Sequence, residues 1–244
     1  MKNIIYISDF FIDNILGGAE LSDEVVINFL TKEGHNIKTV QSRTFDPTIH
    51  KADTFIISNF VFLSPQNKNW FVNSDVNYII IERDQKYVDS RNTVMYPGFI
   101  APPSRVVNKE FYSSANKVFC LSKHSAQLLL SHIDLTNVES LGCTQFSQKQ
   151  FDHIRNSYKE NKNGKWCVVP GKRSNKAIQL CETQKIDFDY LKSYQWKDLI
   201  KVMSEYEGIV FFSHAVETCC RLVIEARMLG LKLKTDNRVG CTYE

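Results

Sequence analysis

The sequence has no run of about 18 consecutive apolar residues, so it lacks the segment that a membrane-spanning helix requires. Met1-Lys2-Asn3 leads directly into a predicted strand, and we expect neither a membrane span nor a signal peptide. Seven cysteines are scattered without a Cys-x2-Cys pair, and six histidines show no zinc-ligand spacing. We therefore expect reduced, partly buried thiols in a cytoplasmic protein, and no metal site.

A strong excess of either charge is also absent. The 30 basic and 27 acidic side chains leave a formal net charge of +3, which fits an anionic ligand but does not demand nucleic acid. The Gly-x-Gly-x-x-Gly fingerprint of dinucleotide-binding loops does not occur, and no acidic residue ends the second predicted strand. We therefore do not expect a nicotinamide or flavin cofactor.

What the sequence does contain is an alternation of apolar runs rich in Ile and Val with longer amphipathic stretches. This alternation is typical of an α/β protein with parallel sheets covered on both faces. In the first part of the chain it predicts strands over residues 3–8, 36–41, 53–58, 76–82 and 117–122. It predicts helices over residues 19–33, 106–114 and 123–133, the first of them ended by Gly34.

The composition changes after Gly142, where residues 145–165 are polar and show no strand pattern. We place a domain boundary near residue 155, giving domains over residues 1–155 and 156–244. A second, shorter alternation then predicts strands over 166–169, 208–213 and 231–235, and helices over 175–181, 196–206 and 218–229. The sequence thus predicts two Rossmann-like domains.

The most informative segment is Glu-Thr-Cys-Cys-Arg-Leu-Val-Ile-Glu-Ala, residues 217–226. It places two carboxylates eight positions apart, after a strand and across the expected start of a helix, where free backbone N–H groups and the helix dipole favour an anion. Eight helical positions span about 12 Å, roughly the distance from ribose to sugar across a pyrophosphate. A nucleotide-diphosphate sugar fits this pattern.

The segment resembles the Glu-x7-Glu signature of retaining GT-B glycosyltransferases, specifically the large family-four group. The resemblance implies that Glu225 holds the ribose hydroxyls and that Glu217 faces the donor sugar as the catalytic residue. Backbone at Thr218 and Cys219, at the expected helix N-terminus, would then receive the diphosphate. The alternative is that Glu225 pairs with Arg221 on a solvated helix face and that Glu217 is loop surface.

Two further segments resemble the same family. Gly17-Gly18-Ala19-Glu20 opens the first predicted helix, and glycines there let the backbone approach a sugar or phosphate closely, although an ordinary turn is the alternative. Gly34-His35 leads into the second strand, where His35 reads as a turn residue. After the strand 166–169, the cations Lys172, Arg173 and Lys176 suit a diphosphate leaving group, or form a solvated basic turn.

The chain departs from the family pattern at the ends of two predicted strands. Relatives carry a histidine there, whereas this sequence has Ser58-Asn59 and Glu82-Arg83-Asp84. Asn59, Arg83, Asp84 and His214 are therefore only candidate residues of the cleft between the two domains. Relatives also continue beyond the position of Gly240 with a helix that returns to the first domain, which this sequence lacks.

Together these motifs predict a GT-B glycosyltransferase that retains anomeric configuration, uses a nucleotide-diphosphate sugar and needs no cofactor or metal. A degenerate module that binds a donor or a partner glycosyltransferase is the alternative, and epimerisation of the donor is a third possibility.

The acceptor is not specified by the sequence. Nucleic acid is possible, given the basic residues 149–172, but is not favoured. The apolar stretches 60–63 and 70–71 would line an acceptor groove or, more simply, pack in the core.

Overall fold

The computed structural model describes residues 1–171, 173–192 and 195–243, and the chain folds as two units. Unit 1 comprises Met1–Gln145 together with Tyr243, and unit 2 comprises Phe146–Thr242. The division lies earlier than the boundary expected near residue 155. The reason is α5 (Gln148–Ser157), whose buried Ile154 packs into the apolar core of unit 2.

Unit 1 is built on a six-stranded sheet in which every pair of neighbouring strands is parallel. Its strands are β1 (Asn3–Ser8), β2 (Asn36–Gln41), β3 (Thr54–Ile57), β4 (Tyr78–Glu82), β5 (Lys117–Cys120) and β6 (Val138–Ser140), in the order β2-β1-β3-β4-β5-β6. The carboxyl ends of all six strands therefore lie at one edge, and the loops that leave them emerge together.

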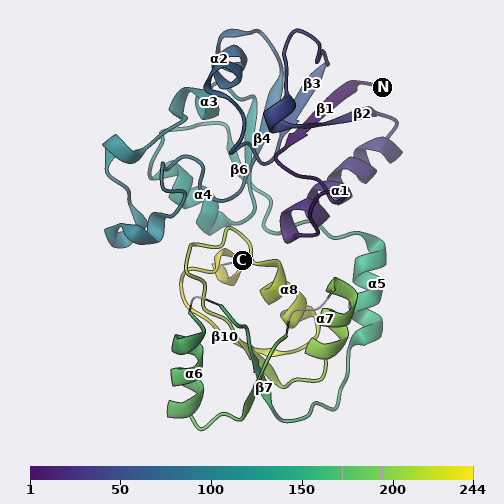
Figure 1. The fold of residues 1–244 in the computed structure, drawn as a ribbon, viewed down its shortest axis with the longest axis vertical. Helices are drawn as coiled ribbons and strands as arrows, with labels where there is room; N and C mark the ends of the chain where they lie inside the picture. Colours follow the sequence, from purple (N-terminus) through teal and green to yellow (C-terminus); the bar gives the residue numbers. More distant parts are fainter. Residues whose placement is uncertain (172, 193–194, 244) are drawn as a thin grey trace. The chain divides into compact units, whose positions relative to one another are not determined.

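Helices cover both faces of this sheet because successive side chains of a strand point in opposite directions. The helices of unit 1 are α1 (Gly18–Lys32), α2 (Pro65–Asn73), α3 (Lys109–Ser113) and α4 (Lys123–Leu130). Ile5 and Ile7 of β1 join the core cluster that also contains buried residues of α2, α3 and α4. Tyr6, between them, hydrogen-bonds to Asp23 of α1 on the other face. Figure 1 shows α1 on one side of the sheet and α2 and α3 on the other.

The core of unit 1 contains several packed aromatic rings. Phe60, Leu63 and Phe71 are buried in it, and the ring centroids of Phe71 and Phe55 lie 5.3 Å apart. Residues 60–63 and 70–71 were expected either to line an acceptor groove or to pack in the core. For Phe60, Leu63 and Phe71, packing in the core is confirmed. Such edge-to-face pairs add to the free energy gained from burial of the rings alone.

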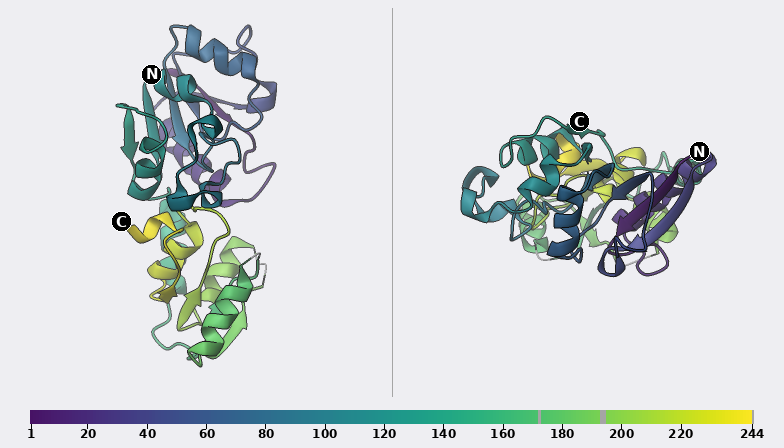
Figure 2. Two further views of the ribbon diagram at one scale, coloured as in Figure 1. Left: turned by 90° about the vertical axis from the view of Figure 1, so that its left-hand side faces the viewer. Right: turned by 90° about the horizontal axis from the view of Figure 1, so that it is seen from above.

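Unit 2 contains a four-stranded parallel sheet, again with helices on both faces (Figure 2). Its strands are β7 (Trp166–Val168), β8 (Phe188–Tyr190), β9 (Gly208–Val210) and β10 (Lys232–Lys234), in the order β10-β9-β7-β8. The remaining helices are α6 (Ser174–Thr183), α7 (Trp196–Met203) and α8 (Arg221–Met228). One core cluster contains buried residues of α5, α7 and α8, and α6 packs against the other face through Ala177 and Cys181.

The sequence located most elements, and two predicted strands, β1 and β2, are confirmed at both ends. It missed α2, whose N-cap Ser64 accepts a hydrogen bond from the Asn67 N–H at 3.1 Å and whose first position is Pro65. It also missed β6 and β8, which are three residues long and only partly buried, so that neither shows an apolar run.

Short 3-10 turns complete the described chain at Ser42–Thr44, Thr93–Met95, Pro97–Phe99, Pro103–Arg105 and Gly240–Tyr243. The first predicted helix ends as expected, because Gly34 adopts the left-handed conformation with φ 84°. No helix among the described residues combines the length and the apolar character needed to cross a membrane.

Candidate functional site

The strand order of unit 2 defines a natural binding position. β7 and β9 are neighbours at the centre of the sheet, whereas the strands that follow them in sequence, β8 and β10, lie on opposite outer sides. Chain segments leaving the carboxyl ends of β7 and β9 therefore diverge, and in open parallel sheets ligands bind in the crevice that such divergence creates. The cations after β7 and Glu217 after β9 both belong to these segments.

Two of the three predicted cations converge there. The Arg173 guanidinium donates to the Ser213 carbonyl at 3.0 Å and to the Asp236 carboxylate at 3.2 Å. Lys176, in the first turn of α6, lies 3.0 Å from the same carboxylate oxygen, with its ammonium 4.3 Å from the centre of the Phe212 ring. Both cations are therefore held in place by one carboxylate. Lys172 lies outside the described residues.

Glu217 belongs to the same arrangement. One of its carboxylate oxygens accepts a hydrogen bond from the Ser213 hydroxyl at 2.8 Å. Its backbone is fixed on both sides, since the Glu217 N–H donates to the Arg238 carbonyl at 2.7 Å and its carbonyl accepts from Gly240 at 2.8 Å. Buried Ser213 thus joins Glu217 to Arg173, through its hydroxyl and its carbonyl respectively.

Ser213, Asp236 and Arg238 were not among the predicted site residues. Asp236 follows the predicted strand 231–235, and Ser213 ends the predicted strand 208–213. In a parallel sheet, polar residues that end or follow a strand lie at the same edge as the ligand. Their position after the predicted strands would therefore have identified Ser213 and Asp236 as site residues. Arg238 contributes a further cation, with a guanidinium nitrogen 3.5 Å from the Ser213 carbonyl.

The predicted helix start at Thr218 and Cys219 is wrong. α8 begins at Arg221, with Cys220 as its N-cap, and the two preceding residues form a bend. Cys219 and Cys220 are buried although they precede the helix. Their apolar side chains therefore extended the helical pattern of the sequence beyond the true start of α8. Any contact of Thr218 or Cys219 with a diphosphate would therefore come from a loop and not from a helix N-terminus.

Glu225 is 2% exposed, and one of its carboxylate oxygens holds two donors. The Trp196 indole N–H donates to it at 2.7 Å, and the Arg221 guanidinium at 2.9 Å. Arg221 also lies 4.0 Å from the centre of the Phe146 ring. The Glu225–Arg221 pair considered from the sequence exists, but it is buried and not on a solvated face. The ribose role of Glu225 stays a prediction.

Burial raises the pKa of Glu225 above its usual value, while Trp196 and Arg221 oppose the shift. The folded state therefore retains a proton that the unfolded chain has already released, so this group lowers stability as pH rises from about 4.5 through its folded pKa. Glu225→Gln cannot titrate but keeps an acceptor oxygen. We expect the stability of this variant, relative to the wild type, to increase across that pH window in urea unfolding. A difference that does not change with pH would contradict this account.

In unit 1, α1 begins at Gly18, one residue before the predicted start, with Gly17 as its N-cap. A Cβ atom added to Gly17 would collide with the Glu20 carboxylate, so the absence of a side chain lets Glu20 fold back over the helix start. Burial raises the pKa of Glu20, and the nearby Asp23 adds to the shift.

The residues proposed for a cleft have different surroundings. Arg83 is buried and pairs with Asp23 at 2.9 Å, and within the described residues no ion pair joins it to its neighbour Asp84. Asp84 is exposed and has a left-handed backbone, with φ 61°. The buried side-chain oxygen of Asn59 has no hydrogen-bond partner among the described residues, and His214 is exposed. Their contact with a ligand stays a prediction.

Comparison with known proteins identifies the fold. No protein-family model matches the chain, and no curated protein matches it in sequence. Solved structures do match. Sucrose-phosphate synthase from Thermosynechococcus elongatus aligns with 100% of this chain and 83% of its own at 9% identity, with a TM-score of 0.64. The catalytic domain of starch synthase IV from Arabidopsis thaliana, bound to ADP and acarbose, aligns with 99% of this chain and 84% of its own at 9% identity, with a TM-score of 0.59.

An alpha-glucosyltransferase in complex with UDP and a 13-mer DNA aligns with 100% of this chain and 84% of its own, at 11% identity and a TM-score of 0.56. These three proteins are GT-B glycosyltransferases. The chain has the GT-B fold. The predicted fold class is therefore confirmed, and the two parallel sheets described above are the two Rossmann-like sheets of that fold.

Proposed function

We propose that this GT-B protein transfers a sugar from a nucleoside-diphosphate sugar, and that unit 2 binds the diphosphate. The observation that carries the proposal is the convergence of Arg173, Lys176 and Glu217 around Ser213 and Asp236, at the carboxyl edge between β7 and β9. The fold supports the same direction, since the structural neighbours named above include proteins solved with UDP or ADP.

The chemistry of the site fits a departing diphosphate. When the bond between sugar and diphosphate breaks, negative charge grows on the leaving oxygen, and donors fixed in advance stabilise that charge without reorganising. Arg173 and Lys176 are fixed by Asp236, whose single carboxylate cannot neutralise both cations. Arg238 adds a third cation beside Ser213. A diphosphate would complete the neutralisation, so the proposed enzyme needs no metal for this step.

Glu217 has the second role. Since Ser213 holds one of its carboxylate oxygens, the side chain has a fixed orientation from which it can accept a hydroxyl of the donor sugar. We propose that this contact positions the sugar and that transfer retains the anomeric configuration. Glu225 would receive the ribose by exchanging its bond to Trp196, which lies on α7. Product stereochemistry, read by NMR, tests retention.

The alternative is a module that binds the donor without catalysis, which the lack of histidine after β3 and β4 favours. A screen of nucleoside-diphosphate sugars by thermal shift comes first, because a ligand at a hundred times its dissociation constant stabilises the folded state by about 2.7 kcal/mol. Donor hydrolysis and transfer to a panel of acceptors are then measured. Turnover supports the transferase, whereas binding without turnover across the panel supports the module. Conversion of the donor without an acceptor would indicate an epimerase.

The acceptor remains open within this proposal. One structural neighbour was solved with DNA, and basic residues are frequent between Lys149 and Lys165. If nucleic acid is the acceptor, its binding weakens steeply as salt concentration rises, because each phosphate contact releases counterions. A flat salt response of DNA binding would exclude this acceptor.

A further inference from the structure

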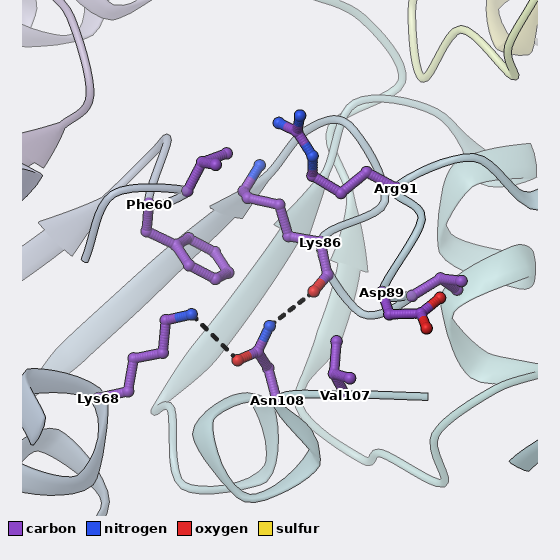
Figure 3. A pocket seen from close by; sticks show the side chains of 9 residues that line it. Phe60, Lys68, Lys86, Asp89, Arg91, Val107 and Asn108 are labelled. Carbon is purple, nitrogen blue, oxygen red and sulfur yellow. Dashed lines mark hydrogen bonds between the residues drawn. The ribbon is translucent and has the colours of Figure 1, made fainter. Parts of the chain in front are cut away.

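Unit 1 contains a pocket with a volume of about 180 Å³, formed by the segments that follow β3 and β4 and by the residues before α3. Three cationic side chains, Lys68, Lys86 and Arg91, line it together with Asn108 and the ring of Phe60. Figure 3 shows Lys68 approaching from α2 and the other two cations from the loop after β4. None of these residues belongs to the proposed diphosphate site.

Lys68 has no carboxylate within ion-pair distance among the described residues. Its ammonium contacts the neutral side-chain oxygen of Asn108 at 3.2 Å and lies 5.4 Å from the centre of the Phe60 ring. Within the described part of the chain it forms no ion pair. Burial lowers the pKa of Lys68 and the nearby Lys86 charge acts in the same direction, while the Asp9 carboxylate opposes the shift. The site therefore holds positive charge that an anion would stabilise.

Lys86 is fixed more firmly, with its side chain 2% exposed. Its ammonium lies 4.0 Å from the buried Glu82 carboxylate, donates to the Arg83 carbonyl and lies 5.1 Å from the centre of the Phe60 ring. The backbone that leads to Lys86 is strained, because Asp84 and Gln85 both have positive φ values, 61° and 54°. Consecutive residues of this kind cost free energy and persist only where the surrounding structure holds them, which is often at functional sites.

Arg91 also adopts a left-handed backbone, with φ 52°, and it forms no ion pair within the described residues. The acidic residue at the pocket, Asp89, is already engaged by Arg105 at 2.9 Å. Once Asp89 is assigned to Arg105 and Glu82 to Lys86, Lys68 and Arg91 have no ion-pair partner among the described residues. The Asp9 carboxylate acts on Lys68 from a distance, but its oxygens accept hydrogen bonds from Ser42, Val61 and Phe62. The excess of positive charge next to apolar Phe60 and Val107 matches an anionic group such as a phosphate, joined to a carbon skeleton.

We propose that this pocket binds a phosphate monoester. Lys68 and Arg91 contact the phosphate oxygens directly, Lys86 adds a fixed positive charge, and the Phe60 ring and valine side chains receive the carbon atoms next to the phosphate. If the ester is the acceptor, the enzyme glycosylates a phosphorylated small molecule, and this assignment rests on the proposed function. The binding of a phosphate monoester in the pocket is independent of the proposed function.

Isothermal titration with glucose 6-phosphate tests the proposal, with glucose and inorganic phosphate as parallel probes. We expect the ester to bind, phosphate to bind more weakly and glucose not to bind. Lys68→Met and Arg91→Met, which remove the charge but keep an unbranched side chain, each weaken ester binding about tenfold or more, as expected for the loss of one charge-assisted contact. Lys109→Met is the matched control, because Lys109 is exposed next to Asn108 and forms no ion pair within the described residues.

Three results overturn the proposal. The first is that the ester does not bind, or binds no more tightly than glucose. The second is that the Lys68 and Arg91 variants bind the ester as tightly as the Lys109 control. The third is that an oligonucleotide without a terminal phosphate competes for the pocket with higher affinity than the ester. Parallel titration with UDP and ADP separates this inference from the proposed function. Binding of either nucleotide without ester binding rejects the pocket alone, whereas ester binding without binding of either nucleotide supports the pocket and rejects the diphosphate site.

Discussion

Replacement of Arg173 by methionine is expected to lower the rate of sugar transfer by about a hundredfold or more, which corresponds to about 2.7 kcal/mol or more of lost transition-state stabilisation. Arg173 contacts both Ser213 and Asp236, and in the proposed reaction its guanidinium would lie where the leaving diphosphate gains charge. The loss should appear mainly in kcat, because the charge is greater in the transition state than in the bound donor.

Two further variants make this prediction specific. Arg173→Lys keeps a positive charge without the planar guanidinium, and we expect it to recover part of the rate. Lys197→Met removes an exposed cation on α7 that forms no ion pair within the described residues, and it should match the wild type. A transfer rate for Arg173→Met within a few-fold of the Lys197 control would show that leaving-group stabilisation lies elsewhere.

Replacement of Arg83 by methionine is expected to destabilise the protein by about 3–5 kcal/mol, because it leaves a buried carboxylate without its cation. The Asp23 side chain is 2% exposed and accepts from Arg83 at 2.9 Å. Three hydroxyl groups, those of Tyr6, Ser8 and Ser58, also donate to it, but they carry no charge. Urea or guanidinium unfolding of the variant gives the loss directly.

A surface pair of the same length provides the control. Arg105 and Asp89 also lie 2.9 Å apart, but their side chains are 59% and 34% exposed, so Arg105→Met should cost no more than about 1 kcal/mol. Asp23→Asn combined with Arg83→Met removes both charges, and this double variant should recover part of the stability. Equal losses of unfolding free energy for the Arg83 and Arg105 variants would mean that the buried pair stabilises the protein no more than the surface pair. A ligand role for Arg83 would then be tested.

The fold was largely predictable because its strongest signals are local. β1 and β2 are six-residue strands, and the first helix lies between a pair of glycines and a third glycine with positive φ. The start of α8 was mistaken because buried Cys219 continues the apolar stripe of the helix. β6 and β8 escaped notice because edge strands of three residues carry no apolar pattern.

The candidate sites were only partly predictable because they depend on contacts between segments far apart in the sequence. Arg173, Lys176 and Glu217 follow strands and were found from motifs, but Asp236, which holds both cations, lies 60 positions from Lys176. The burial of Glu225 depends on Trp196, which is 29 positions away. The pocket of unit 1 draws Lys68, Lys86 and Arg91 from two different segments, and none of them belongs to a recognisable motif.

The most direct test of the central claim is calorimetric titration of UDP in the presence of EDTA. If the cations after β7 take up the diphosphate, the wild type binds one UDP per chain without added metal. Arg173→Met combined with Lys176→Met should then weaken binding about a hundredfold or more, because two charge-assisted contacts are lost. Affinity in the double variant equal to that of the wild type, or UDP binding that appears only when a divalent metal is added, would contradict the account.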